Sequence, residues 1–330
     1  MSELLQTLAS YVPGLMTRRI AADPTPITTA TAERFPAAVL FADISGFTPL
    51  TERLAQRGPA GLEFLTQLLN SYFGQLVDVI TDHGGDVVKF AGDALIALWP
   101  AADAEAAQAI SLQEATRLAT QCGATIQGSL HDWETAEGVR LSLRFTVAAG
   151  EVFLVHVGGA YNRWEFVVTG RPLGQVSAAE KIARPGEVVL TPRAWELVAD
   201  FCRGTALADG HVRLESIQEL PHTRPAPVTP VTAAMEAGLR AYIPGAILAR
   251  LSAGQGGWLA ELRRVTVLFI DLPDLNYTTP LEQAQQTMRA LQGALYRFEG
   301  SVNKISVDDK GTTLVAVMGL PPVVHEDDPV

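Results

Sequence analysis

The chain has 330 residues, 48% hydrophobic and 18% charged, a globular composition with room for two domains. Its net charge of −11 and the absence of a Lys/Arg cluster exclude a broad nucleic-acid surface. Two widely separated cysteines, Cys122 and Cys202, have no zinc-ligand spacing and indicate free thiols. Since no apolar run could span a bilayer and no signal-peptide pattern opens the chain, we expect a cytoplasmic protein.

The order of expected elements predicts the fold class. An amphipathic helix over residues 2–20, broken at Pro13-Gly14, and a connector come first. The alternation of strands and helices that follows is the split βαβ pattern, so we expect an α+β, ferredoxin-like (βαββαβ) domain with additions. Its expected elements are a strand over 37–44, a helix over 59–82, strands over 86–91 and 94–99, a helix over 103–128, strands over 141–149, 151–157 and 164–169, a helix near 173–183 and a strand over 187–191.

The same pattern restarts near residue 261, which indicates an internal repeat. The offset is 228 residues between Phe41 and Phe269 and 219 between Asp93 and Thr312. The second copy reaches only its first strand, helix and hairpin, so we expect a fragment or an incomplete second domain. The expected division is an N-terminal helix and connector (1–32), a first domain (33–200), a linker (201–260) and the start of a second domain (261–330).

Asp43 and Asp93 lie in stretches where a charge is hard to explain as packing. Asp43 follows the apolar run from residue 37, and Asp93 follows Gly92 between two strands. Carboxylates on neighbouring strands repel each other unless a cation lies between them, and hard divalent cations bind oxygen ligands and phosphates. We therefore predict a metal-phosphate site. The simpler interpretations are a turn residue for Asp93 and a helix N-cap for Asp43.

Several segments carry a family resemblance. Those that resemble class III nucleotidyl cyclases are Phe41-Ala42-Asp43-Ile44-Ser45-Gly46-Phe47-Thr48, Lys89-Phe90-Ala91-Gly92-Asp93 and residues 144–152. The tandem layout and Leu8-Ala9-Ser10-Tyr11-Val12-Pro13 are most similar to soluble, bicarbonate-responsive adenylyl cyclases. The resemblance covers residues 5–200 and 261–330. It implies that two cyclase domains pair within the chain and convert ATP to cyclic AMP and pyrophosphate.

The resemblance also implies roles for single residues. Asp43, Asp93 and the carbonyl of Ile44 would hold two divalent ions, Mg²⁺ or Mn²⁺, and Arg144 would neutralise the leaving pyrophosphate. The turn Ser45-Gly46-Phe47-Thr48 opens a helix whose backbone N–H groups suit phosphate oxygens. Lys304 is similar to an adenine-contacting lysine and favours ATP over GTP, although a lysine near a strand end is more commonly solvated.

In this family an Asn/Arg pair stabilises the transition state. Gly174 and Ala178 occupy those positions in the first domain, and the pair is expected beyond Val330. The 330-residue chain alone is therefore expected to bind Mg-ATP and turn it over little or not at all.

The second domain keeps Asp271 in place of Asp43 but has Thr312 in place of Asp93. One complete and one degenerate site are therefore expected, unless a shifted hairpin brings Asp308 or Asp309 into the position of Thr312.

The resemblance also suggests a bicarbonate site at Lys89. The arginine expected with it is replaced by Ser177, with Arg171 as the alternative partner. Two further functions stay open: a non-catalytic nucleotide-sensing or dimerisation module of a larger signalling protein, and a guanylyl cyclase.

Overall fold

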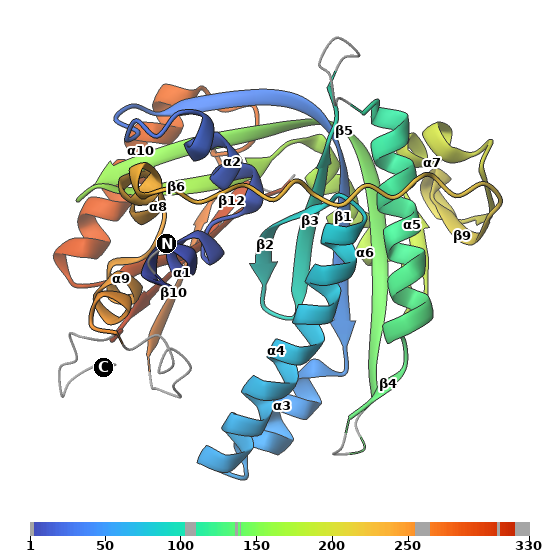
Figure 1. Ribbon diagram of the computed structural model, residues 1–330, viewed down its shortest axis with the longest axis horizontal. Helices are drawn as coiled ribbons and strands as arrows, with labels where there is room; N and C mark the ends of the chain where they lie inside the picture. The colour runs from blue at the N-terminus through green and yellow to red at the C-terminus, as the bar shows by residue number, and fades with distance from the viewer. Residues whose placement is uncertain are drawn as a thin grey trace. The chain divides into compact units, whose positions relative to one another are not determined.

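The computed structural model describes residues 3–102, 110–135, 138, 140–254, 265–308 and 311–320 (Figure 1). The chain forms two compact units. The first, here the large-sheet unit, comprises Phe35–Val152 and Arg171–Pro227. The second, here the small-sheet unit, comprises Met1–Arg34, Phe153–Gly170 and Val228–Val330. These units cut across the expected boundaries at residues 32, 200 and 260, because the long strands β1 (Thr31–Ser45) and β5 (Arg140–Ala160) contribute residues to both.

The main sheet has the strand order β2-β3-β1-β5-β7-β9-β8, with β4 and β6 also pairing with β5. Strand β1 pairs with β3 in antiparallel fashion, and β5 pairs with β7 in parallel. The order of β2, β3, β1 and β5 is that of a ferredoxin-like sheet and confirms the α+β class. The other strands are β2 (Asp86–Ala91), β3 (Ala94–Pro100), β4 (Trp133–Glu134), β6 (Arg163–Thr169), β7 (Val188–Leu190), β8 (Cys202–Ala206) and β9 (Val212–Ile217).

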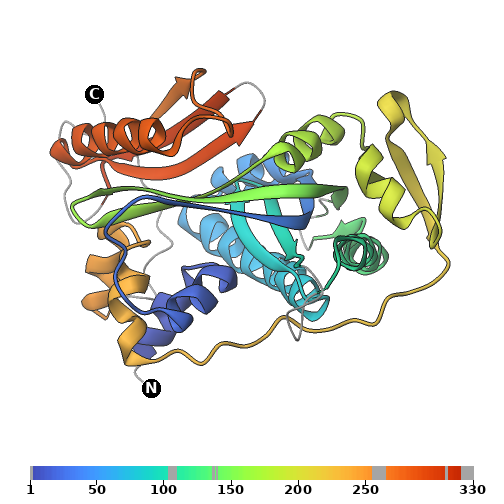
Figure 2. The same ribbon diagram turned by 90° about the horizontal axis from the view of Figure 1, so that it is seen from above.

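Helices cover both faces of this sheet in the large-sheet unit. Figure 2 shows α5 and α6 on opposite sides of it. The main core lies on the side of α4 and α5, where Leu76, Ile80 and Ile126 pack against the sheet. The helices are α3 (Phe47–Ala55), α4 (Pro59–Asp82), α5 (Leu112–Leu130), α6 (Arg171–Glu180) and α7 (Pro192–Val198).

Strand alternation places the predicted site residues on the α6 face. Successive side chains of a strand point to opposite faces. Leu143 and Phe145 of β5 belong to the core with α4 and α5, so Arg144 between them faces the other side. Thr146 shares that side, and its hydroxyl donates to the Val176 carbonyl of α6 at 3.2 Å. The same parity on β1 directs Asp43 away from the core.

The small-sheet unit holds a three-stranded antiparallel sheet of order β10-β12-β11. The β5–β6 hairpin packs on it through Val157 and Val167, which share a core with Met288, Leu295 and Val302. The elements are α1 (Glu3–Ser10), α2 (Gly14–Ala22), α8 (Glu236–Arg240), α9 (Gly245–Ser252), β10 (Thr266–Leu272), α10 (Leu281–Arg297), β11 (Ser301–Asp308) and β12 (Gly311–Met318).

The two sheets share one register. Strand β1 pairs with β3 as β10 pairs with β12, with the offsets of 228 and 219 residues expected from the sequence. The equivalent pairs are Val39↔Leu98 and Val267↔Val317, and Asp43↔Ala94 and Asp271↔Thr313. The hairpin register therefore places Thr312 at the position of Asp93.

A second internal similarity escaped the sequence analysis. Residues 8–14 read Leu-Ala-Ser-Tyr-Val-Pro-Gly, and residues 239–245 read Leu-Arg-Ala-Tyr-Ile-Pro-Gly. Both segments form a helix, a turn at the proline and a second helix. The two motifs pack on each other through α1, α2 and α8. Gly238 permits a close approach, because a Cβ there would lie 2.8 Å from Cγ2 of Ile20.

Three sequence expectations need correction. The expected linker over 201–260 contains β8, β9, α8 and α9, because β9 adds to the sheet beside β7. The expected strands 141–149 and 151–157 are one strand, β5, which changes partner from β7 to β6 along its length. The expected helix over 103–128 begins at Leu112, where Ser111 accepts a hydrogen bond from Glu114 N at 3.1 Å; residues 103–109 lie outside the described part.

Candidate active site

Asp43 and Asp93 come together at the end of β1. Asp43 pairs with Ala94, and the Ile44 N–H donates to the Asp93 carbonyl at 3.2 Å. The turn that carries Asp93 depends on Gly92, whose φ is +72°. Asp43 is 9% exposed and Asp93 is half-buried. The backbone register thus holds two carboxylates on neighbouring segments, as the sequence predicted.

Arg144 lies on the Asp43 carboxylate. Its Nε donates to Asp43 Oδ2 at 2.7 Å, and its Nη2 lies 2.7 Å from the same oxygen. Nη2 also donates to Glu180 Oε1 at 2.8 Å, at the last residue of α6. One guanidinium therefore contacts two carboxylates and offsets part of their charge. The sequence had suggested a phosphate contact for Arg144.

The electrostatics show a site with surplus negative charge. Burial raises the pKa of Asp43, the Arg144 charge and hydrogen bond oppose that rise, and the nearby Asp93 adds to it. Burial likewise raises the pKa of Glu180, against Arg144 and with contributions from Asp43 and Asp93. A cation placed between these carboxylates would relieve both the desolvation and the repulsion.

The donor set fits a hard divalent cation. Asp43, Asp93 and the Ile44 carbonyl offer oxygen ligands, which Mg²⁺ and Mn²⁺ prefer. The Arg144 guanidinium occupies the place of a cation at Asp43, which shows that this carboxylate binds a positive charge. Within the described ranges no group of three or more His, Cys, Asp or Glu side chains could hold a metal ion. A metal here would therefore need main-chain and substrate oxygens as further ligands.

The turn after β1 has the geometry expected of a phosphate-binding loop. Gly46 is the N-cap of α3, with φ of +93° and no side-chain cap. A Cβ at Gly46 would lie 2.6 Å from the Arg140 carbonyl, so only glycine fits. The chain thus passes from Asp43 at the end of β1 into a helix start that has no side-chain cap for its backbone N–H groups. The side chain of Thr48 lies outside the described part.

The residues of the second sheet are placed less favourably for a metal. Lys304 is half-buried on β11, beside a register irregularity against β12. Asp271 is exposed. Thr312 is 2% exposed and donates to the Leu275 carbonyl at 2.6 Å. The Asp308 side chain and Asp309 lie outside the described part. The role of Lys304 toward a base stays a prediction.

Helix α6 carries the positions at which the family's Asn and Arg were sought. Gly174 is buried and Ala178 is exposed, and neither has a functional group. Ser177 is half-buried on the same helix, whereas Lys89 is half-buried on β2. The bicarbonate hypothesis rests on these residue types alone.

Sequence reasoning missed Glu180. It is the last residue of α6 and follows Ala178 and Ala179. Lys181 comes directly after it, so the sequence offers a local partner for its charge and no signal for a distant one. The partner itself could not be inferred, because Arg144 lies 36 residues earlier on another element.

Comparisons with known proteins identify the family of the chain. A family model described as "Adenylate and Guanylate cyclase catalytic domain" matches residues 31–216, more than half of the chain. Adenylate cyclase type 10 from Oryctolagus cuniculus and from Homo sapiens are each 28% identical over 324 residues, or 87% of this chain and 19% of those proteins. The chain thus spans about a fifth of the length of these curated relatives.

The chain also matches a solved structure. The adenylyl cyclase CyaB from P. aeruginosa matches 59% of this chain and 99% of its own, with 23% identity and a TM-score of 0.47. In the described ranges, no helix is both long and apolar enough to cross a membrane. The family match covers the strands that carry Asp43 and Arg144 and the β2–β3 turn that carries Asp93. The chain therefore belongs to the class III nucleotidyl cyclase family.

Proposed function

We propose that the chain is the catalytic region of an adenylyl cyclase, which converts ATP to cyclic AMP and pyrophosphate. One observation carries the proposal: Asp43 and Asp93 meet beside an uncapped helix start, with Arg144 held on Asp43. The curated relatives, which are named adenylate cyclases, favour ATP as the nucleotide, and so does Lys304.

Each residue has a separate task in this proposal. Asp43, Asp93 and the Ile44 carbonyl hold two divalent ions. When bound, the ions lower the pKa of the ribose 3′-hydroxyl and offset phosphate charge. The N–H groups of Ser45, Gly46 and Phe47 bind phosphate oxygens. Arg144 moves from Asp43 to the departing pyrophosphate, a transfer that its exposed fraction of 27% permits.

We further propose that residues 266–318 belong to a second cyclase copy. The shared strand register supports this, and so does the repeated helix–proline–helix motif at 8–14 and 239–245. The base-recognition role of Lys304 and the pairing of the two copies follow from that assignment. Thr312 makes the second site degenerate.

The second candidate is a nucleotide-binding module without turnover, which Gly174 and Ala178 on α6 favour. The two candidates share the binding site and differ only in chemistry. Cyclic AMP formation by the chain at about 1 s⁻¹ or faster would exclude the second candidate.

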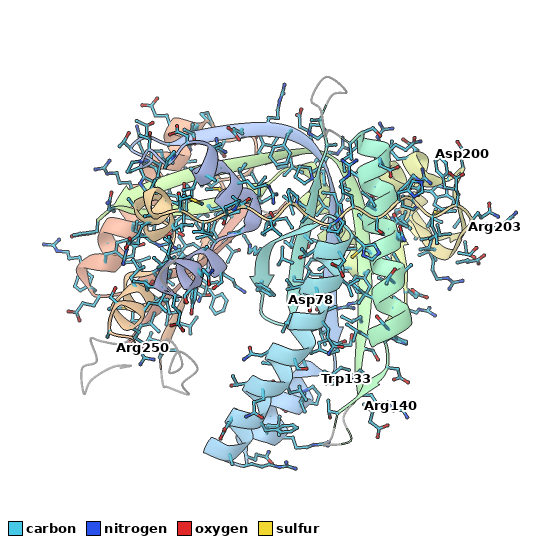
Figure 3. The ribbon with its side chains drawn as sticks, viewed as in Figure 1. Asp78, Trp133, Arg140, Asp200, Arg203 and Arg250 are labelled. Carbon is cyan, nitrogen blue, oxygen red and sulfur yellow. The ribbon has the colours of Figure 1, made fainter. Side chains whose placement is uncertain are left out.

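Mn-ATP binding to the 330-residue chain tests the shared site. We expect saturable binding in equilibrium dialysis, with ATP preferred over GTP in competition. Asp43→Asn and Asp93→Asn should each weaken binding at least tenfold, because each removes a charged metal ligand. Asp78→Asn is the matched control, because Asp78 is exposed on α4 (Figure 3). Unchanged Mn-ATP binding in both site variants would contradict the assignment.

A further inference from the structure

A cavity of about 550 Å³ lies within the small-sheet unit. It is bounded by the β5–β6 turn, the α8–α9 segment and the C-terminal end of α10. None of its lining residues belongs to the large-sheet unit, which contains Asp43 and Arg144. Its volume is within the range of small-molecule sites, roughly 300–1,000 Å³. The cavity is therefore separate from the cyclase residues described above.

Backbone strain gathers at this cavity. Five non-glycine residues of the described part have positive φ, and three of them line it: Tyr161 (+52°), Asn162 (+65°) and Glu299 (+59°). A two-residue hairpin turn requires positive φ, but Asn and Gly usually supply it, and a bulky Tyr pays a steric cost. Strained residues cluster at ligand sites, where the strained conformation is part of how the site works.

The strained turn places the aromatic ring of Tyr161 at the cavity, where it stays exposed and is not buried in a core. Tyr161 is 78% exposed. Its ring makes an edge-on contact with the ring of Tyr296, with centroids 6.0 Å apart and planes 65° from parallel. The Tyr296 hydroxyl donates to Glu165 at 3.5 Å, which fixes that ring. Ile243 and Leu248 add apolar surface to the same cavity. A flat apolar ring would cover these side chains.

Two arginines supply positive charge. Arg240 donates through Nε to Glu236 at 2.8 Å, and its two terminal nitrogens have no hydrogen bond to the described residues. Arg163 donates to the Trp164 carbonyl and to Glu165, while its buried Nε has no partner in the described part. The free fork of Arg240 matches a carboxylate or sulfonate.

The acidic residues limit the charge of the ligand. Glu299 lines the cavity, and Glu165 and Glu236 lie behind the two arginines. A triphosphate would meet these three carboxylates, whereas a single negative charge on Arg240 would not. We infer that the cavity binds a small amphiphilic monoanion, in which a flat apolar ring contacts Tyr161 and Tyr296 and one carboxylate or sulfonate contacts Arg240.

The probe 8-anilinonaphthalene-1-sulfonate tests this site, because it has this chemistry and fluoresces when it leaves water. We expect saturable binding with one site per chain and competition by 2-naphthoate. Arg240→Gln should weaken the probe at least fivefold, and Ala246→Phe, which fills the cavity from its wall, should abolish binding. Arg250, labelled in Figure 3, lies on α9 and is not one of the residues that line the cavity, so Arg250→Gln should leave the affinity unchanged.

Thermal melting of each variant separates loss of the site from loss of the fold. Phe269→Ser controls for adhesion to the exposed strand β10, where Phe269 is 73% exposed. The proposal is overturned by any of three results: no saturable binding, equal weakening in Arg250→Gln or Phe269→Ser, or an affinity within twofold of wild type in both Arg240→Gln and Ala246→Phe when both variants are folded.

Discussion

Removing Arg144 should strengthen metal binding in the nucleotide-free protein while it weakens binding of the nucleotide. Two unit charges about 4 Å apart interact by about 4 kcal/mol at an effective dielectric constant of 20. Arg144 shares its charge with Glu180, and its side chain is 27% exposed, so a cation at Asp43 competes with roughly 1–3 kcal/mol of this interaction. Arg144→Gln should therefore tighten Mn²⁺ binding by about 5- to 160-fold.

Electron paramagnetic resonance of free Mn²⁺ measures this affinity directly. Arg140→Gln is the matched control, because Arg140 lies on the same strand four residues earlier, is 62% exposed and contacts Asp132 at 2.8 Å (Figure 3). The control should not change the Mn²⁺ affinity. If Arg144→Gln leaves Mn²⁺ affinity unchanged or lowers it, Arg144 does not hold the place of the metal.

Two further predictions concern buried groups of the small-sheet unit. Burial, aided by the charge of Arg19, lowers the pKa of His156 to about 4. The stability contribution of the neutral His156 is therefore complete above pH 6.5 and falls by about 1.4 kcal/mol per pH unit as the pH drops toward 4. In NMR spectra, one of the six histidines should stay neutral at pH 5, and its signal should be absent from the His156→Gln variant. Burial raises the pKa of Glu165, so its stability contribution is complete at low pH and is lost as the pH rises. The melting temperature of Glu165→Gln should therefore gain on that of the wild type as the pH rises, and a pH-independent difference would contradict this.

Local signals predicted most of the main sheet. Helix α4 begins and ends where expected, because Pro59 follows Gly58 at its start and Gly84-Gly85 follows its end. The sequence indicates two strands, over 141–149 and 151–157, where the structure has the single strand β5. Its continuity depends on two different partner strands, and no local pattern records these.

The meeting of Asp43 and Asp93 was predictable from the sequence, but the contacts of Asp43 were not. Asp43 and Asp93 are each recognisable as charges in apolar surroundings, and the register then brings them together. The Arg144–Asp43 pair joins residues 101 positions apart, and Glu180 joins it from a third element. Such a network depends on which face of β5 packs against α6. The alternation of side chains along β5 assigns each residue to a face, but the sequence does not say which face covers the main core.

The two sheets share a register but differ in the surroundings of the residues at matching positions. Asp43 is buried, and Arg144 offsets its charge. In the second sheet the equivalent Asp271 is exposed, so it needs no cation. Thr312, at the place of Asp93, is buried and its hydroxyl is satisfied by the Leu275 carbonyl. A neutral, hydrogen-bonded side chain is stable there without a metal, so the second hairpin keeps its fold without a metal site.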